Sequence, residues 1–156
     1  MNHSDIIYKF YDAFAAADAE TMLSCYHDQI EFEDPAFGKL KGDEAKNMWR
    51  MLIGRSKGDI KITFDNVRAD ENSGSAHWKA VYHYGPQKRR VINNIRAEFE
   101  FSDGKIIKHV DRFDLWKWSR QALGLPGFLL GWTSFLKNKI QKQTGKLLKS
   151  YSDKRI

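Results

Sequence analysis

Hydrophobic residues recur every three or four positions in three stretches near the start of the chain, which is the spacing of amphipathic helices. The first stripe comprises Ile6, Ile7, Phe10, Tyr11 and Phe14. Ser4 or Asp5 can cap this helix at its start. The pattern predicts a second, short helix over about 18–27 and a third over about 42–55. Between them, the segment 30–34 predicts a short strand.

From residue 59 the period of the pattern changes to two, which is the period of a half-buried strand. The alternation covers four segments, 60–65, 76–84, 91–101 and 107–115. The segments between these strands contain turn residues, at 72–74, 85–86 and 102–104. Four strands joined by tight turns predict an antiparallel meander whose apolar face must be covered by the N-terminal helices. The predicted fold class is therefore α+β, with a cone-shaped curved antiparallel sheet wrapped around N-terminal helices and a C-terminal helical extension.

Charge divides the 156-residue chain into two parts, although its net value is only +6. Residues 117–156 contain nine basic residues and one acid, whereas residues 1–116 contain 17 basic and 19 acidic residues. We therefore expect a domain over 1–116 and a basic amphipathic extension over 117–156. Because the net positive charge is confined to the extension, the sequence favours no nucleic acid as a partner.

The extension predicts a short helix at 119–124 and a longer one that begins at Pro126. The apolar stripe of the longer helix comprises Phe128, Leu129, Trp132, Leu136, Ile140, Leu147 and Tyr151. Packing on the body or on a partner is the favoured interpretation, because amphipathicity is the general signature of a surface helix. The alternative is association with a membrane surface through residues 126–151, since the opposite face is rich in lysine. Thr144-Gly145 interrupts the stripe and predicts a break in the helix.

Three short motifs, in this order and spacing, resemble a known superfamily. They are Cys25-Tyr26-His27-Asp28 followed by I-E-F-E-D-P at 30–35, L-K-G-D-E-A at 40–45, and G-K-I-I-K-H-V-D at 104–111. Residues 4–116 are similar to the cone-shaped fold of nuclear transport factor 2, steroid Δ-isomerase and the SnoaL-type polyketide cyclases. This fold supports enzymes, transport factors and inert scaffolds, so function must be argued from the site.

Asp34 is the first candidate catalytic residue. In the isomerase pattern, the Asp of E-D-P is the base that moves a proton next to a ketone, and a carboxylate in an apolar pocket is suited to this role. The alternative is that Asp34 only caps the turn at Pro35 or pairs with a nearby lysine. The resemblance places the oxyanion tyrosine of the isomerase at Phe10, with Tyr11 as its neighbour. Its second Asp falls on Arg96 or Ala97, so an authentic steroid isomerase is not predicted.

His109 and Asp111 form the second candidate pair, because strand alternation places both on the inward face together with Ile107. In the SnoaL-type cyclases an Asp on this strand is the proposed acid/base, and Asp111 is the nearest match. His109, two residues away on the same face, could share or relay the proton. The alternative is a purely structural pair of Asp111 with His109 or Arg112.

Asn93 is a candidate ligand-binding residue, because it is the one polar side chain on the inward face of its strand. The expected walls of the pocket are Tyr11, Trp49, Trp78, Tyr82 and Phe113. The histidines are scattered and no phosphate-binding glycine motif is present, so we predict no metal and no cofactor.

These features predict a protein with a pocket for a hydrophobic small molecule, possessing carboxylates suited to cofactor-free acid/base chemistry on a carbonyl compound. The alternative is a non-catalytic ligand-binding or dimerisation module. The resemblance implies a homodimer that forms through the outer face of the sheet. The chain lacks the pattern of a signal peptide at its start and has a single cysteine, Cys25, so we expect a cytoplasmic location.

Overall fold

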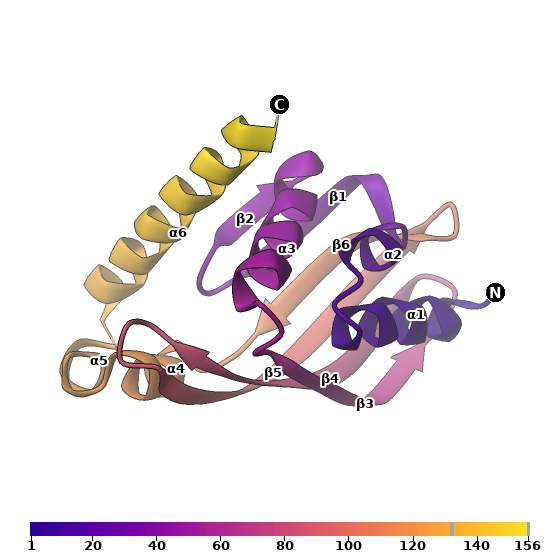
Figure 1. The fold of residues 1–156 in the computed structure, drawn as a ribbon. Helices are drawn as coiled ribbons and strands as arrows, with labels where there is room; N and C mark the ends of the chain where they lie inside the picture. Colours follow the sequence, from indigo (N-terminus) through magenta and orange to yellow (C-terminus); the bar gives the residue numbers. More distant parts are fainter. Residues whose placement is uncertain (132, 156) are drawn as a thin grey trace.

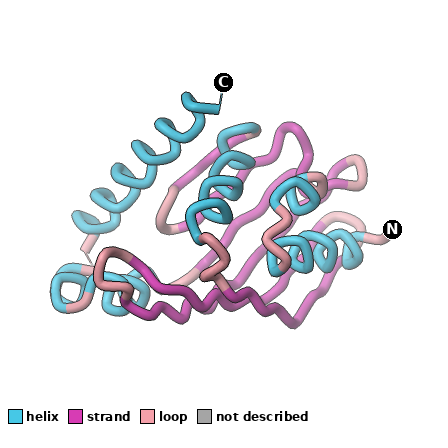
Figure 2. Tube along the Cα trace, viewed as in Figure 1, coloured by secondary structure: helices cyan, strands magenta, loops and turns pink. Residues whose placement is uncertain are grey.

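The computed structural model describes residues 1–131 and 133–155, which form six helices and six strands (Figures 1 and 2). The first half of the chain contains α1 (His3–Ala15), α2 (Ala19–Leu23), β1 (Tyr26–Asp34), β2 (Gly38–Lys41) and α3 (Asp43–Ser56). The meander follows, with β3 (Lys61–Ala69), β4 (Ser73–Tyr84), β5 (Arg89–Ser102) and β6 (Lys105–Arg112). The extension forms α4 (Leu115–Leu123), α5 (Leu125–Leu130) and α6 (Ser134–Arg155).

The six strands form one curved sheet in the order β2-β1-β6-β5-β4-β3. Strands β3 to β6 pair antiparallel with their sequence neighbours, as the tight turns between them require. Strand β1 lies beside β6 in parallel and pairs with β2 antiparallel. Helices α1, α2 and α3 cover the inner face (Figure 1). The predicted α+β cone is therefore confirmed.

Strand β1 is longer than predicted and helix α2 is shorter. The helix ends at Leu23 and the strand begins at Tyr26, whereas the pattern alone extended the helix to about residue 27. Tyr26 pairs with Ile106 of β6, and the Ile106 amide donates to the Cys25 carbonyl at 2.8 Å. Pairing between distant segments thus overrides the local helical pattern at this point.

A register irregularity between β5 and β6 changes which side chains of β6 face inward. Glu100 pairs with Lys108 and Phe101 pairs with Ile106, so Ile107 is skipped. Ile106 is fully buried, and the prediction that Ile107 faces inward is wrong. The extra residue of a β-bulge shifts the alternation by one position, which a strict period of two cannot anticipate.

The extension also differs from its predicted elements. Helix α4 begins at Leu115, four residues earlier than expected, because the Asp114 carboxylate accepts from the Lys117 amide at 3.1 Å and caps it. The single helix predicted from Pro126 is two helices, and α6 is continuous through Gly145. Trp132 of the predicted stripe lies outside the described residues.

Helix α6 packs against α3 with one face and lies at the edge of the body beside β2 (Figure 1). Ile140 and Leu148 are buried there. Leu147, which the stripe included, is 45% exposed, because Leu148 takes the inward position one step further along the helix. No described helix is both long and apolar enough to cross a membrane.

Two apolar clusters hold the molecule together. The main core lies between the inner sheet face and helices α1 to α3. A second cluster forms beneath the extension around Val91, Trp118, Ala122 and Ile140. Tyr82 and Phe113 pack against both clusters, so they mark the junction between the body and the extension.

Candidate functional site

A chain of hydrogen bonds between buried side chains crosses the main core. The Tyr26 hydroxyl lies 2.7 Å from His109 Nδ1, and His109 Nε2 lies 2.8 Å from Asp111 Oδ1. Two indole N–H groups close the chain at its ends. Trp49 Nε1 donates to the Tyr26 hydroxyl at 2.9 Å, and Trp78 Nε1 donates to Asp111 Oδ1 at 3.2 Å. Strands β1, β4 and β6 and helix α3 thus meet at one polar network.

The indole groups can only donate, which leaves two arrangements of the Tyr26–His109 bond. The arrangement that satisfies the Tyr26 proton has this proton donated to His109 Nδ1. His109 then carries its proton on Nε2 and donates it to the Asp111 carboxylate. In this tautomer every participating atom of Tyr26, His109 and Trp49 has a partner.

Aromatic rings enclose this network. His109 is fully buried and stacks on Trp49, with ring centroids 6.1 Å apart, and the rings of Phe10, Phe32 and Phe99 surround it. The residues that the sequence suggests as pocket walls, Tyr11, Trp49 and Trp78, belong to the same buried cluster. The structure therefore brings His109 and Asp111 together, but in a packed interior.

Tyr11 holds a buried hydroxyl that makes no hydrogen bond within the described part of the chain. Burial, and then the negative charge of Asp111, raises the pKa of this hydroxyl well above its ordinary value. The same two causes raise the pKa of Tyr26. Both phenols accordingly remain protonated and can act only as neutral hydrogen-bonding groups near neutral pH.

Asp34 ends β1 and turns the chain toward β2. Its Oδ1 accepts from the amides of Ala36 at 2.9 Å and Phe37 at 2.6 Å, so the carboxyl caps the turn that contains Pro35. Oδ2 makes no hydrogen bond to the residues that the structure describes. The side chain keeps some solvent exposure, although protein atoms surround the carboxyl. Its pKa is raised to about 7, chiefly by burial, while the Phe37 amide opposes the shift and the charge of Asp111 adds to it.

Tyr82 lies within electrostatic reach of Asp34. Its hydroxyl accepts from Trp118 Nε1 at 2.7 Å, and its own proton has no partner within the described residues. Burial raises the pKa of Tyr82 to about 12, so the hydroxyl remains a donor. The Tyr82 hydroxyl is a candidate that sequence reasoning overlooked, because the pattern indicated Tyr82 only as a wall. Nothing in the sequence indicates that Trp118 would direct it.

Helix α6 holds the other side of the Asp34 turn. Gln141 Nε2 donates to the Pro35 carbonyl at 3.0 Å, and Thr144 Oγ1 donates to the Ala36 carbonyl at 2.8 Å. Asn93 is partly buried on β5, opposite Ala80, and no described residue hydrogen bonds to its side chain. Asp34 thus lies within electrostatic reach of one phenol donor, and the turn that it caps contains Ala36 and Phe37, which pack against the second and the main cluster, respectively.

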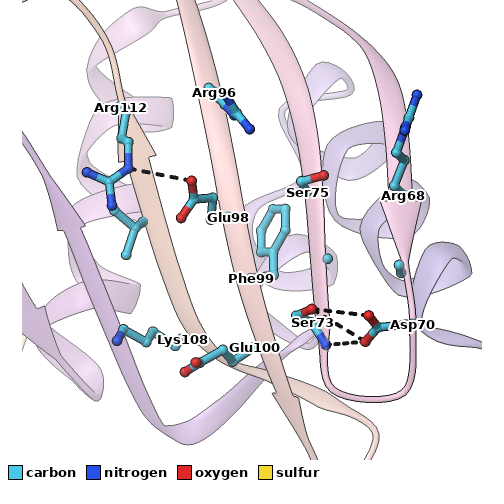
Figure 3. Close-up of a pocket in the computed structure, with 13 residues that line it drawn as sticks. Arg68, Asp70, Ser73, Ser75, Arg96, Glu98, Phe99, Glu100, Lys108 and Arg112 are labelled. Atoms are coloured by element: carbon cyan, nitrogen blue, oxygen red, sulfur yellow. Dashed lines mark hydrogen bonds and ion pairs between the residues drawn. The ribbon is translucent and has the colours of Figure 1, made fainter.

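Three hollows on the surface are lined by residues other than Asp34, His109 and Asp111. One, of about 580 Å³, lies on the outer face of the sheet, with Arg68, Arg96 and Arg112 beside Glu98 and Glu100 (Figure 3). Arg112 pairs there with Glu98 at 3.6 Å. Within the described residues, no group of three or more His, Cys, Asp or Glu side chains could hold a metal ion.

Solved structures share this fold at low sequence identity. An LEH-like epoxide hydrolase from Mycobacterium tuberculosis is 22% identical, with a TM-score of 0.60, 80% of this chain covered and 92% of that one. Bal32a, from a soil-derived mobile gene cassette, is 20% identical, with a TM-score of 0.65 and coverages of 76% and 94%. A candidate polyketide cyclase from Pseudomonas putida is 16% identical, with a TM-score of 0.63 and coverages of 78% and 98%.

None of the curated proteins compared with the chain matches it. The model of the SnoaL-like domain family, in contrast, matches residues 7–109, which is about two thirds of the chain. This match contains most of α1, all of α2, α3 and β1 to β5, and most of β6. It also contains Asp34, Tyr82 and His109, and it ends two residues before Asp111. The chain therefore belongs to the SnoaL-like family, within the superfamily that shares the fold of nuclear transport factor 2.

Proposed function

We propose that this protein binds a hydrophobic carbonyl compound at the junction of its two apolar clusters and moves a proton on it with Asp34. The observation that carries the proposal is the state of the Asp34 carboxyl. One oxygen is fixed by two backbone amides, the other is free of hydrogen bonds to the described residues, and burial raises the pKa to about 7. A base with a pKa near the working pH is well matched to proton transfer.

In this mechanism, Asp34 accepts a proton from the carbon next to the carbonyl group, and the electron pair of the broken C–H bond forms an enolate. The Tyr82 hydroxyl, whose proton has no partner in the described structure, donates to the carbonyl oxygen as its negative charge develops. Asp34 then returns the proton to the same or another carbon. Isomerisation and ring closure both begin with this step, and neither needs a cofactor.

The role of the buried pair differs in this proposal from the one that the family resemblance implies. Asp111 is 3% exposed and His109 is not exposed, so neither meets a substrate at the junction. We propose instead that Asp111 acts on Asp34 through its charge, which helps to keep the Asp34 pKa high. Trp49 and Trp78 donate into the network and Tyr11 packs against Trp78, whereas Tyr82 and Phe113 face the ligand.

The test is a thermal-shift screen of the full chain against steroids, aromatic polyketides and other apolar carbonyl compounds. A ligand that binds only the native state raises the melting temperature by mass action. Each hit is then incubated in D2O, and deuterium incorporation next to its carbonyl is followed by NMR. We expect binding with exchange in the wild type, and binding without exchange in Asp34→Asn.

Glu33→Gln is the matched control, since Glu33 is the adjacent carboxylate and pairs only loosely with Lys39 at 3.9 Å. It should exchange deuterium like the wild type. Deuterium exchange that survives in Asp34→Asn would exclude Asp34 as the base. Binding without exchange in the wild type itself would favour a non-catalytic ligand-binding module.

A dimerisation module is the second candidate function, and the outer face of the sheet favours it. Basic and acidic side chains alternate around the hollow of Figure 3, so a two-fold contact would set Arg96 and Arg112 of one copy against Glu98 and Glu100 of another. Light scattering would test this. We expect the mass of a dimer for the wild type, and the mass of a monomer for Arg96→Glu.

A further inference from the structure

Helix α5 presents its large apolar side chains to solvent and its small residues to the body. Gly127 lies so close to α4 that a Cβ atom there would overlap the Ser119 carbonyl, and a Cβ atom at Gly131 would approach Ser119 Cβ to 2.9 Å. Trp116 Nε1 also donates to the Phe128 carbonyl at 3.1 Å, which anchors α5 to α4. An ordinary surface helix buries its large apolar face instead.

The exposed apolar side chains of α5, together with that of Phe135 at the start of α6, form what we call the α5 patch. It consists of Leu125, Phe128, Leu129, Leu130 and Phe135, and each is about half exposed or more. Leu125 and Phe135 are the most exposed, at 68% and 70%. Exposed apolar patches of this kind on a folded protein mark interaction sites. The patch lies at the corner of the molecule where α4, α5 and the start of α6 meet (Figure 1).

The stretch of chain that contains this patch is basic and has no acidic residue. Between Asp114 and Asp153 the chain contains seven basic residues and no acidic one. On α6, exposed side chains at 135, 139, 142, 146 and 149 recur every three or four residues and therefore share the outward face. This face begins with Phe135 of the patch and continues as a lysine stripe of Lys139, Lys142, Lys146 and Lys149.

We infer that the α5 patch and the lysine stripe dock the protein on the surface of an anionic lipid bilayer. The six residues of α5 are too short to span a membrane, but Leu and Phe side chains on a fixed helix can enter the boundary between headgroups and acyl chains. The lysines then lie at the level of the headgroups, where each cation gains attraction from anionic lipid. Charge complementarity favours this partner, since Phe135 of the patch lies on the same face of α6 as the lysine stripe.

Vesicle flotation with the full-length protein tests the inference. The probes are vesicles of phosphatidylcholine alone, and vesicles with about 30 mol% phosphatidylserine, at low and at high salt. We expect binding to the anionic vesicles that weakens with salt, and much weaker binding to the neutral ones. No binding of the wild-type protein to anionic vesicles would overturn the inference.

Two variants separate the apolar and the electrostatic contributions. Leu125→Ser/Phe135→Ser changes the two most exposed patch residues and should reduce binding at least tenfold with little effect on the melting temperature. Lys139→Gln/Lys142→Gln/Lys146→Gln should lower affinity for anionic vesicles roughly fivefold per charge and remove most of the salt dependence.

Matched controls keep the test specific. Leu147→Ser removes an exposed apolar side chain of α6 outside the patch, and Lys9→Gln/Lys105→Gln/Lys108→Gln removes three exposed charges from other elements. Both should bind like the wild type. Equal losses in variants and controls would contradict a defined docking surface. A patch variant that instead lowers the mass of the protein in solution would identify a second copy as the occupant and refute the lipid surface.

Discussion

The hydroxyl of Tyr26 lies 2.7 Å from Nδ1 of His109, and this contact joins two halves of a buried hydrogen-bond chain. Trp49 donates into one end and Trp78 into the other. Because the participating groups are enclosed by aromatic rings, a partner that is removed cannot be replaced by water without disturbing the core.

Tyr26→Phe should therefore destabilise the protein markedly. The substitution leaves the Trp49 N–H and the His109 Nδ1 buried without their partner, and an unsatisfied buried group costs about 1–3 kcal/mol. We expect the free energy of unfolding in urea to fall by about 2 kcal/mol or more. Tyr8→Phe is the control, since Tyr8 is 48% exposed, and it should leave the free energy of unfolding nearly unchanged.

Tyr11→Phe, unlike Tyr26→Phe, should not lower the free energy of unfolding. The Tyr11 hydroxyl is buried and has no hydrogen-bond partner among the described residues, so folding desolvates it without compensation. Removing it should leave the protein equally stable or stabilise it by up to about 1 kcal/mol, measured by the same urea unfolding. A loss comparable to that of Tyr26→Phe would show that the hydroxyl has a bonded partner in solution.

Stability should fall as pH rises through the range in which Asp34 ionises. The pKa of Asp34 is about 7 in the folded protein and 3.8 in its ordinary state, so the folded form binds more protons between these values. The free energy of unfolding that this group contributes is therefore largest below about pH 4, declines up to about pH 7, and is level above it.

Asp34→Asn removes this titration while the Asn Oδ1 can still accept from the Ala36 and Phe37 amides. The stability of the variant relative to the wild type should accordingly increase from about pH 4 to about pH 7. Chemical denaturation at several pH values measures the difference. A difference that stays constant across this range would mean that the folded pKa of Asp34 is close to its ordinary value.

Two glycines of the extension should respond to alanine in opposite directions. At Gly127 a Cβ atom would overlap the Ser119 carbonyl, so Gly127→Ala must displace α5 and should cost more than about 1 kcal/mol. Gly145 lies inside α6, and a Cβ atom there would meet no other described residue within 4 Å. Gly145→Ala should stabilise the protein by about 0.5–1 kcal/mol, because alanine favours the helical backbone. Parallel thermal and urea unfolding of the two variants checks both signs.

The sequence was sufficient for the α+β class and the strand meander, because the period-two alternation spans four long segments. Predictions from the sequence were wrong at positions where contacts between distant segments determine the local structure. Pairing of Tyr26 with Ile106 ends the second helix early, and the bulge at Ile107 shifts the inward face of β6. The buried position of Leu148 rather than Leu147 depends on how α6 sits on α3, which periodicity cannot specify.

The candidate site could likewise be predicted from the sequence only in part. Asp34 is conspicuous beside Pro35, and both of its suggested features coexist, since the carboxyl caps the turn and is also largely desolvated. The direction of the Tyr82 hydroxyl could not be anticipated, because Trp118 lies 36 residues away and belongs to the extension. Tyr26 stands in a motif that carries the family resemblance, which was the one available signal for it.

The hydrogen bonds from α6 to the turn that follows Asp34 should help to keep the pKa of Asp34 raised. Gln141 and Thr144 donate hydrogen bonds to the carbonyls of Pro35 and Ala36, and Ala36 packs against the second cluster. Gln141→Ala/Thr144→Val removes both bonds, so water should reach the carboxyl and its pKa should fall from about 7 toward its ordinary value. NMR titration of the labelled Asp side chains measures this pKa, with Gln143→Ala as the control because Gln143 is exposed on the same helix.

An unchanged Asp34 pKa in the double variant would show that the body alone buries the carboxyl. A lowered pKa would make α6 part of the site. The proposed proton transfer by Asp34 and the proposed docking on a lipid surface would then involve the same helix. The outward face of α6 carries the lysine stripe, and its inward face holds the turn next to the proposed base. Repeating the NMR titration in the presence of anionic vesicles then tests whether docking strengthens the contact between α6 and the turn and so changes the Asp34 pKa. Because one rigid helix connects the two faces, we expect vesicles to raise the Asp34 pKa in the wild type and to leave it unchanged in the double variant.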